Sequence, residues 1–214
     1  MTTTAARVAL EVADWRRRTG ILYAEVRQLS ADDPAAGHAR WRSGRDDLFA
    51  HHPASPVPAE HRRDFTGLPV AAYDPDWRFE LPILDAEPAT IEMSTGTDGD
   101  VAFERVGRLA LPGGDELDLW RLTTYGGGFF LPVRDGLAGR PGGTYGGGRY
   151  LLDTIKGADL GVGSDPSTLV IDFNFAYNPS CAYDPAWACP LAPPGNIVTA
   201  EIGAGELYRE PPAS

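Results

Sequence analysis

The hydrophobic residues of this chain change their spacing once, near Phe65. Before Phe65, apolar residues recur every three or four positions, which is the spacing of one face of an α-helix. After Phe65, apolar and polar residues alternate, and this alternation is typical of a half-buried β-strand. The sequence therefore predicts a helical N-terminal part that is followed by a β-rich part.

Two helices are predicted in the N-terminal part. Asp33 and Pro34 mark the start of the second helix, because Asp is a favourable N-cap and Pro fits the first helical position. We expect this helix to end before His52-Pro53, since the residue before a proline disfavours the helical conformation. His51 and His52 are then expected to be exposed at the C-terminal end of the helix. The apolar stripe of the first helix comprises Val8, Val12, Trp15, Thr19, Leu22, Val26 and Leu29.

Several short strands are predicted after Phe65. Trp77, Phe79 and Leu81, for example, alternate with Arg78 and Glu80. The 25 glycines and 19 prolines are spread between the apolar runs and indicate frequent turns. No helical pattern separates these runs, so we expect a mainly β fold: an antiparallel β-sandwich or partly open barrel, with the N-terminal helical pair packed against it. The other strand candidates are Thr90–Met93, Val101–Leu111, Leu117–Leu122, Phe129–Val133, Arg149–Leu152, Thr168–Phe175 and Ile197–Ile202.

The same signals divide the chain into four parts. Residues 1–50 are expected to form the helical segment, and residues 51–64 a linker that prolines interrupt. Residues 65–208 are expected to form the β-rich core domain, followed by a C-terminal tail over residues 209–214. A length of 214 residues suits one domain with a sizeable core and a small helical addition.

The net charge of the chain indicates which classes of binding partner are unsuitable. The formal net charge is −11 at pH 7. Phosphate binding needs a basic surface, so we expect neither nucleic acid nor an anionic membrane surface as a partner. No apolar run approaches the roughly 20 residues that span a bilayer. Acidic residues also interrupt the N-terminal stretch where a signal peptide needs an apolar core, so the sequence predicts a cytoplasmic protein.

The two cysteines, Cys181 and Cys189, are expected to be free thiols, because a disulfide rarely persists in a reducing cytosol. We expect at least one of them to be buried behind the Tyr183–Trp187 loop as a small apolar group. A zinc site needs four ligands, and no histidine lies near the two cysteines in sequence, so no metal is predicted. The chain also lacks a dinucleotide fingerprint and a phosphate-binding loop, and no cofactor is predicted.

One stretch has an unusual composition: DFNFAYNPSCAYDPAWACPLAPP, from Asp172 to Pro194. It begins like a strand and then combines aromatic residues, both cysteines and several prolines. Upstream, the chain reads TYGGGRYLLDTIKGADLG from Thr144 to Gly161. With a GGRYL segment, a DFN-AYNP-C segment and a CP-PP segment in this order, the chain resembles the actinobacterial branch of the domain of unknown function 1684 family. The resemblance extends over roughly Trp41 to Glu206, and it implies no particular activity.

Polar residues in these two stretches form a candidate site. If both stretches are strands, Arg149 and Asp153 share one face, and Asp172 and Asn174 share another. If the two strands pair, the Arg149 fork faces a carboxylate across the ladder, and Lys156 lies nearby. The interpretation that we favour for such a pair is a structural ion pair that holds two strands in register.

Three functions from different classes stay open. The favoured hypothesis is a small molecule bound in a cleft near the 172–189 segment, where aromatic and polar side chains occur together. The first alternative is a hydrolase that uses Asp172 or a cysteine thiol, although no known catalytic motif is present and no catalytic residue is assigned. The second is an interaction module that dimerises through the N-terminal helix, so the chain is expected as a monomer or a homodimer. The candidate ligand-binding residues are Arg149, Asp153, Asp172, Asn174, Asn178 and Tyr183.

Overall fold

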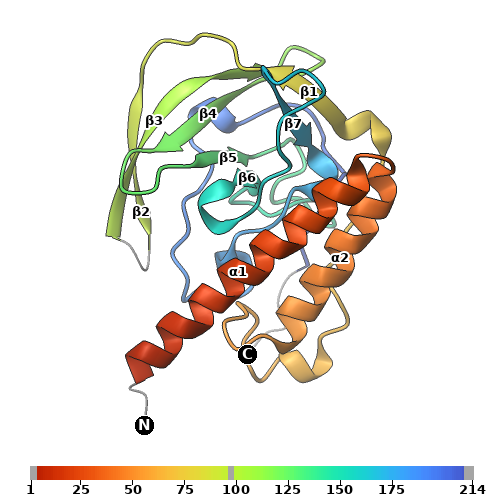
Figure 1. Ribbon diagram of the computed structural model, residues 1–214, viewed down its shortest axis with the longest axis vertical. Helices are drawn as coiled ribbons and strands as arrows, with labels where there is room; N and C mark the ends of the chain where they lie inside the picture. The colour runs from red at the N-terminus through yellow and green to blue at the C-terminus, as the bar shows by residue number, and fades with distance from the viewer. Residues whose placement is uncertain (1–3, 96–98, 210–214) are drawn as a thin grey trace.

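A helical hairpin packs across a β body in the computed structural model, which describes residues 4–95 and 99–209 (Figure 1). Helix α1 spans Thr4–Ser30 and helix α2 spans Pro34–His51. The start of α2 is confirmed, because the Asp33 carboxylate accepts hydrogen bonds from the second and third residues of the helix and Pro34 is its first residue. The hairpin therefore forms where the periodicity and the cap residues indicate.

The apolar stripe of α1 is covered over only part of its length. Leu22 and Val26 are buried in a cluster that α2 and the β body also form. Towards the N-terminus, α1 extends past the β body, and Val8 is 49% exposed (Figure 1). Within the described part of the chain, no helix combines the length and the apolar character that crossing a bilayer requires.

Seven strands form the β body in the described residues. Five of them make an antiparallel sheet in the order β2-β3-β4-β5-β6, and β1 pairs with β7 in a separate two-stranded ribbon. Because β2 and β6 are the two edges of the larger sheet, it does not close into a barrel over the residues described. The strands are β1 (Arg78–Pro82), β2 (Thr90–Thr95), β3 (Gly99–Ala110), β4 (Glu116–Leu122), β5 (Phe129–Val133), β6 (Arg149–Asp153) and β7 (Thr168–Asp172). Short 3₁₀ helices are η1 (Arg62–Asp64), η2 (Pro75–Trp77), η3 (Thr154–Lys156), η4 (Phe173–Phe175), η5 (Ser180–Ala182) and η6 (Pro194–Asn196).

Two hydrophobic cores meet at strand β7. Leu169 and Ile171 pack with buried leucines from β3, β4, β5 and β6. Val170, between them, packs instead with Tyr23 and Trp41 of the helical hairpin. Alternation along the strand thus gives one face to the core of the β body and the other face to the helices. This arrangement confirms the mainly β fold with an N-terminal helical pair packed against it.

Strand β7 is shorter than the sequence predicts. It ends at Asp172, and the next three residues form the 3₁₀ turn η4. The Asp172 carboxylate accepts a hydrogen bond from the Asn174 amide at 3.0 Å, which caps the turn and ends the ladder. Asp172 and Asn174 consequently do not share the face of one strand.

The predicted strand at Ile197–Ile202 is wrong. In this segment, Ile197 forms an isolated parallel bridge with Arg134. The amides of Thr199 and Ala200 donate to the Asp115 carboxylate, at 3.1 and 3.0 Å, and not to a neighbouring strand. A side-chain acceptor from a distant turn therefore takes the place of a ladder.

Candidate functional site

A cavity of about 100 Å³ lies between the helical hairpin and the β body, and we call it the interface cavity. Its walls combine aromatic rings with a few polar groups, which is the usual composition of small-molecule sites. Five of its lining residues belong to the 172–189 segment. The lining residues are Trp15, Thr19, Leu22, Tyr23, Arg45, Leu48, Phe49, Pro56, Tyr150, Asp153, Lys156, Ala158, Tyr177, Asn178, Pro179, Ser180 and Cys189.

A buried ion pair lies at this cavity. The Arg45 guanidinium donates to the Glu206 carboxylate at 2.8 Å, and Glu206 is fully buried. The guanidinium carbon lies 5.1, 4.8 and 4.9 Å from the ring centres of Trp41, Phe49 and Tyr177, which is a cation–π arrangement. The Nε atom of Arg45 is buried without a hydrogen-bond partner. Arg45 is thus firmly positioned and still has one free donor.

Asn178 lies where two cavities meet. It lines the interface cavity and a second cavity of about 210 Å³, which we call the linker cavity because residues 57–69 supply much of its wall. The Asn178 backbone amide donates to Glu206 at 3.1 Å, and its side-chain amide donates to the Leu207 carbonyl at 3.0 Å. The side-chain oxygen Oδ1 is buried and has no partner. Buried acceptors of this kind are normally satisfied by a ligand or an ordered water.

Tyr183, like Asn178 and Glu206, lines the linker cavity. Its hydroxyl donates to the Glu206 carboxylate. Burial, together with this carboxylate, raises the pKa of Tyr183 well above its usual value, so the phenol stays neutral and remains a donor. One buried carboxylate thus connects residues of the two cavities.

A second ion pair, between Asp153 and Lys156, also lines the interface cavity. Asp153 is buried at the end of β6, and its carboxylate lies 3.2 Å from the exposed Lys156 ammonium. Tyr23, Tyr150 and Tyr177 line the same cavity. Burial raises the pKa of all three phenols, that of Tyr23 to about 12, so they are neutral near pH 7. The cavity therefore offers neutral hydroxyls beside one carboxylate and one ammonium group.

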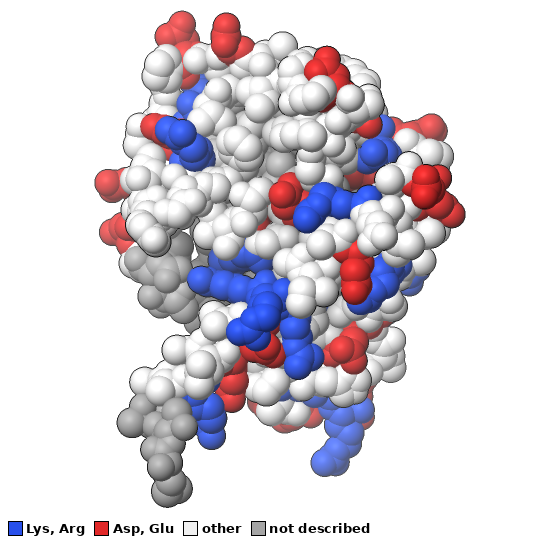
Figure 2. All heavy atoms as spheres, in the orientation of Figure 1, with Lys and Arg blue, Asp and Glu red and all other residues white. Residues whose placement is uncertain are grey.

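Positive charge gathers near this cavity although the chain as a whole is acidic. Figure 2 shows Lys and Arg side chains clustered over the middle of α1. In this part of α1, the exposed Arg16, Arg17 and Arg18 follow one another in sequence. The turn η3, which carries Lys156, packs against α1 close to Gly20. Lys156, which lines the interface cavity, therefore lies close to the basic surface of α1.

Arg149 lies outside both cavities. Its fully buried guanidinium donates to the Asp135 carboxylate at 3.0 Å and to the carbonyls of Ile202 and Ala204. The condition for an Arg149–carboxylate pair across a ladder is not met, because β6 pairs with β5 and β7 pairs with β1. Arg149 instead ties the C-terminal segment to the β5–β6 hairpin.

Asp172 and Asn174 are also buried outside the two cavities. The Asn174 side chain bonds both backbone groups of Asp74, accepting from its amide and donating to its carbonyl, each at 2.8 Å. Burial raises the pKa of Asp172 to about 6, against the hydrogen bonds from Asn174 and the nearby Arg78 guanidinium, which act in the other direction. The two side chains hold the turn around Asp74 against the β body.

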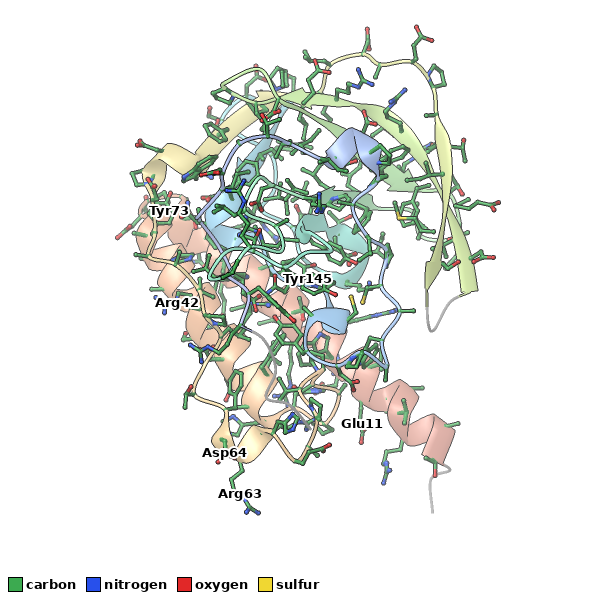
Figure 3. The ribbon with its side chains drawn as sticks, turned by 180° about the vertical axis from the view of Figure 1, so that it is seen from behind. Glu11, Arg42, Arg63, Asp64, Tyr73 and Tyr145 are labelled. Carbon is green, nitrogen blue, oxygen red and sulfur yellow. The ribbon has the colours of Figure 1, made fainter. Side chains whose placement is uncertain are left out.

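The two cysteines are free thiols, as predicted. The expectation that at least one is buried is wrong, since both are partly exposed. The physical reason is that the loop between them is itself largely exposed and does not cover them. Cys189 lines the interface cavity, and the Tyr145 hydroxyl donates to the Cys181 sulfur at 3.7 Å. Figure 3 shows Tyr145 next to the short turn η5 that carries Cys181.

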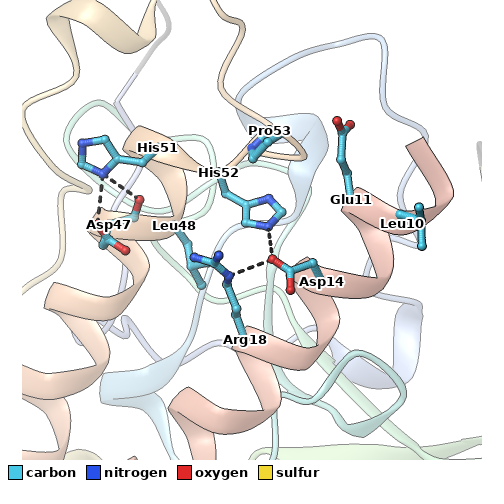
Figure 4. Close-up of a pocket in the computed structure, with 9 residues that line it drawn as sticks. All are labelled: Leu10, Glu11, Asp14, Arg18, Asp47, Leu48, His51, His52 and Pro53. Atoms are coloured by element: carbon cyan, nitrogen blue, oxygen red, sulfur yellow. Dashed lines mark hydrogen bonds and ion pairs between the residues drawn. The ribbon is translucent and has the colours of Figure 1, made fainter. Parts of the chain in front are cut away.

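A larger groove of about 330 Å³ lies between α1 and the end of α2 (Figure 4). His51 is exposed there as predicted, but His52 is only 4% exposed, which corrects the expectation of an exposed pair. His52 packs against the Trp15 ring, and its Nε2 lies 3.2 Å from the Asp14 carboxylate. Its Nδ1 accepts from the Ala54 amide, so Nε2 carries the proton. Because both ring nitrogens are occupied within the hairpin, this groove is the weaker candidate for a ligand.

The structure thus brings together three of the six predicted site residues. Asp153 and Asn178 line the interface cavity, and Asn178 and Tyr183 line the linker cavity. Sequence reasoning missed Arg45 and Glu206. Arg45 had a detectable signal, since it lies four residues after Trp41 on the apolar face of α2, where a charge needs a buried partner. Within the described residues, no cluster of three or more His, Cys, Asp or Glu side chains is placed to hold a metal ion.

Comparison with known proteins gives a family and a structural relative. The family model described as "Protein of unknown function (DUF1684)" matches residues 63–207. The solution NMR structure of an uncharacterized protein from Haloarcula marismortui is 32% identical, with a TM-score of 0.57. That match covers 83% of this chain and 95% of the other chain. The search of the curated proteins found no match.

Proposed function

The chain belongs to the DUF1684 family, whose description assigns no function, and we propose one from the site itself. The protein binds a small polar molecule in the interface cavity, beside the 172–189 segment. The observation that carries this proposal is the Oδ1 atom of Asn178, a buried acceptor without a partner. Asn178 lines a cavity that Arg45, with its own unpaired donor, also lines.

The polarity of the cavity determines which ligand suits it. A ligand needs a donor for Asn178 Oδ1 and an acceptor for Arg45 Nε, because leaving either group unpaired costs about 1–3 kcal/mol. The volume of about 100 Å³ corresponds to roughly three water molecules. The ligand is therefore a molecule of a few heavy atoms, or the polar end of a longer molecule. The basic surface around Lys156 favours an anionic or neutral ligand over a cationic one.

The alternatives have less support from the same geometry. Asp172 lies outside both cavities and is bonded to Asn174, so neither cavity supports a hydrolase built on Asp172. The covered part of the α1 stripe packs within the chain, which supports intramolecular packing over dimerisation through α1.

The first prediction concerns Tyr177, which lines the cavity and whose phenol stays neutral because burial raises its pKa well above the usual value. Thermal-shift measurements with small polyols, amides, carboxylates and amines should reveal a compound that raises the melting temperature of the wild type. For that compound, Tyr177→Phe should weaken binding by about 3- to 10-fold, the equivalent of one hydrogen bond. The melting temperature of the free protein should change little.

Tyr125→Phe is the matched control, because Tyr125 is fully exposed. This variant should bind the compound like the wild type. If Tyr177→Phe and Tyr125→Phe bind every stabilising compound as tightly as the wild type does, the binding site is not the interface cavity.

A further inference from the structure

Cys181 and Cys189 lie together at the edge of the β body. Cys181 belongs to the turn η5, and Cys189 follows an exposed loop. Both thiols are partly exposed, so a dissolved small molecule can reach them. Each of the two thiols is the largest influence on the pKa of the other, and this mutual effect requires their sulfur atoms to lie close together. Two accessible thiols that lie close together are a different chemical group from two isolated cysteines.

The segment that carries them is fixed at both ends. Pro179 and Pro190, each adjacent to the cysteine segment, are buried. The Tyr150 hydroxyl donates to the Pro190 carbonyl at 2.5 Å, which anchors the C-terminal end. Within the loop, the Asp184 carboxylate accepts from the Ala186 amide at 2.9 Å. These contacts keep the two sulfur atoms close without a covalent bond.

The two thiols differ in acidity. The hydrogen bond from Cys189 lowers the pKa of Cys181 to about 6, although burial acts in the opposite direction, and the bond from the Tyr145 hydroxyl lowers it further. The pKa of Cys189 is raised, chiefly because its thiol donates to Cys181. Cys181 is therefore the nucleophile of the pair near neutral pH, and Cys189 keeps its proton until a later step.

We propose that Cys181 and Cys189 form a redox-active dithiol that a small-molecule disulfide oxidises reversibly to an intramolecular disulfide. The Cys181 thiolate attacks one sulfur of the small disulfide, forms a mixed disulfide and releases one thiolate. That thiolate takes up a proton. Cys189 then loses its proton to solvent and attacks the Cys181 sulfur, which releases the second small thiol. The net reaction converts two protein thiols and one small disulfide into one protein disulfide and two small thiols.

Although Cys189 lines the interface cavity, the proposal does not rest on ligand binding there, because the exchange needs only the two thiols and the oxidant. It also agrees with free thiols in the resting protein. An intramolecular disulfide would form only when the surrounding pool of small disulfides rises. The structure thus adds a modification site to the proposed binding site.

The test uses the full chain, reduced, desalted and then incubated with oxidised glutathione. Remaining thiols are blocked with iodoacetamide, and the intact mass is measured. The expected product has lost two hydrogen atoms, carries no blocking group and returns to the reduced mass with dithiothreitol. The variant Cys189→Ser should stop at the mixed disulfide and keep one glutathione on Cys181.

A second measurement needs no substitution at a cysteine. With limiting iodoacetamide at a slightly acidic pH, peptide mapping should find the label on Cys181 in about tenfold excess over Cys189. Tyr145→Phe should move the pH midpoint of Cys181 labelling upward, because one donor to the thiolate is lost. Glutathione on both cysteines without an intramolecular bond, disulfide-linked dimers, or equal labelling of the two thiols would each overturn the proposal.

Discussion

Asp172 shows how a buried carboxyl group can serve the fold at a cost in stability. Its Oδ1 accepts from both the backbone amide and the side-chain amide of Asn174. Its Oδ2 is buried without a hydrogen bond, and the Arg78 guanidinium lies 3.8 Å away. Burial therefore dominates and raises the pKa of Asp172 from 3.8 to about 6.

The second prediction follows from the sign of this shift. Between pH 3.8 and about 6, the folded chain binds more protons at Asp172 than the unfolded chain does, so the stability contribution of Asp172 falls as pH rises through this window. Asp172→Asn removes the ionisation and keeps an oxygen for the Asn174 amide. As the pH rises from about 4 to about 7.5, the free energy of unfolding of the variant should increase by up to about 3 kcal/mol relative to that of the wild type.

Urea unfolding of both proteins at the two pH values measures this difference. Asp165→Asn is a suitable comparison, because Asp165 is an exposed carboxylate whose pKa is lowered by hydrogen bonds from Ser167. That variant should show no gain with rising pH. An Asp172→Asn difference that does not change with pH would mean that the Asp172 carboxyl titrates as an ordinary exposed one.

At this scale, the sequence indicated which residues are unusual but not which partners they have. The structural ion pair that we favoured for Arg149 exists, yet its partner is Asp135, fourteen positions earlier in the chain. Which carboxylate becomes the partner of Arg149 depends on the pairing of β5 with β6, and this pairing includes a register shift after Leu131. No local pattern in the sequence reports such a shift.

For helix α1, the structure differs most from what the sequence predicts. The sequence predicts one continuous apolar stripe along α1, but the rest of the chain covers only part of this stripe. Leu22 is 3% exposed, whereas Leu10 on the same helix is 66% exposed. These two leucines allow a matched comparison of packing within one helix.

The third prediction uses this pair. Leu22→Ala should lower the free energy of unfolding by about 2–5 kcal/mol, because it leaves a cavity in a packed cluster. Leu10→Ala should change it by less than about 0.5 kcal/mol. Chemical unfolding measures both values. In sedimentation velocity, Leu10→Ala should have the same mass state as the wild type; a loss of mass would show that α1 joins two chains.

The elements themselves were largely predictable, and their ends were not. The periodicity of the apolar residues located both helices and the strands of the sheet, since the hydrophobic face of each element must be buried. β7, in contrast, ends early because a side chain caps the next turn, and the segment from Ile197 bonds to Asp115. Such ends depend on side-chain acceptors that compete with the ladder.

At the scale of the whole molecule, the candidate site lies where the helical hairpin meets the β body. Arg45 and Glu206 are separated by 161 positions in sequence, and they meet only because the hairpin packs across the β body. Asn178 and Tyr183 were identified from an unusual stretch, but the two cavities that they line require residues from the whole chain. Sequence reasoning could therefore name part of the site and could not assemble it.

Native mass spectrometry of the full chain tests whether a small molecule binds in the interface cavity. The protein is purified gently, incubated with a low-molecular-weight extract of the cells that express it, and compared with its denatured mass. We predict a discrete mass increase under native conditions that is lost in Ala158→Met, because this substitution fills the interface cavity. Identical native and denatured masses after this incubation, or an equal increase in Ala158→Met, would contradict binding in the interface cavity.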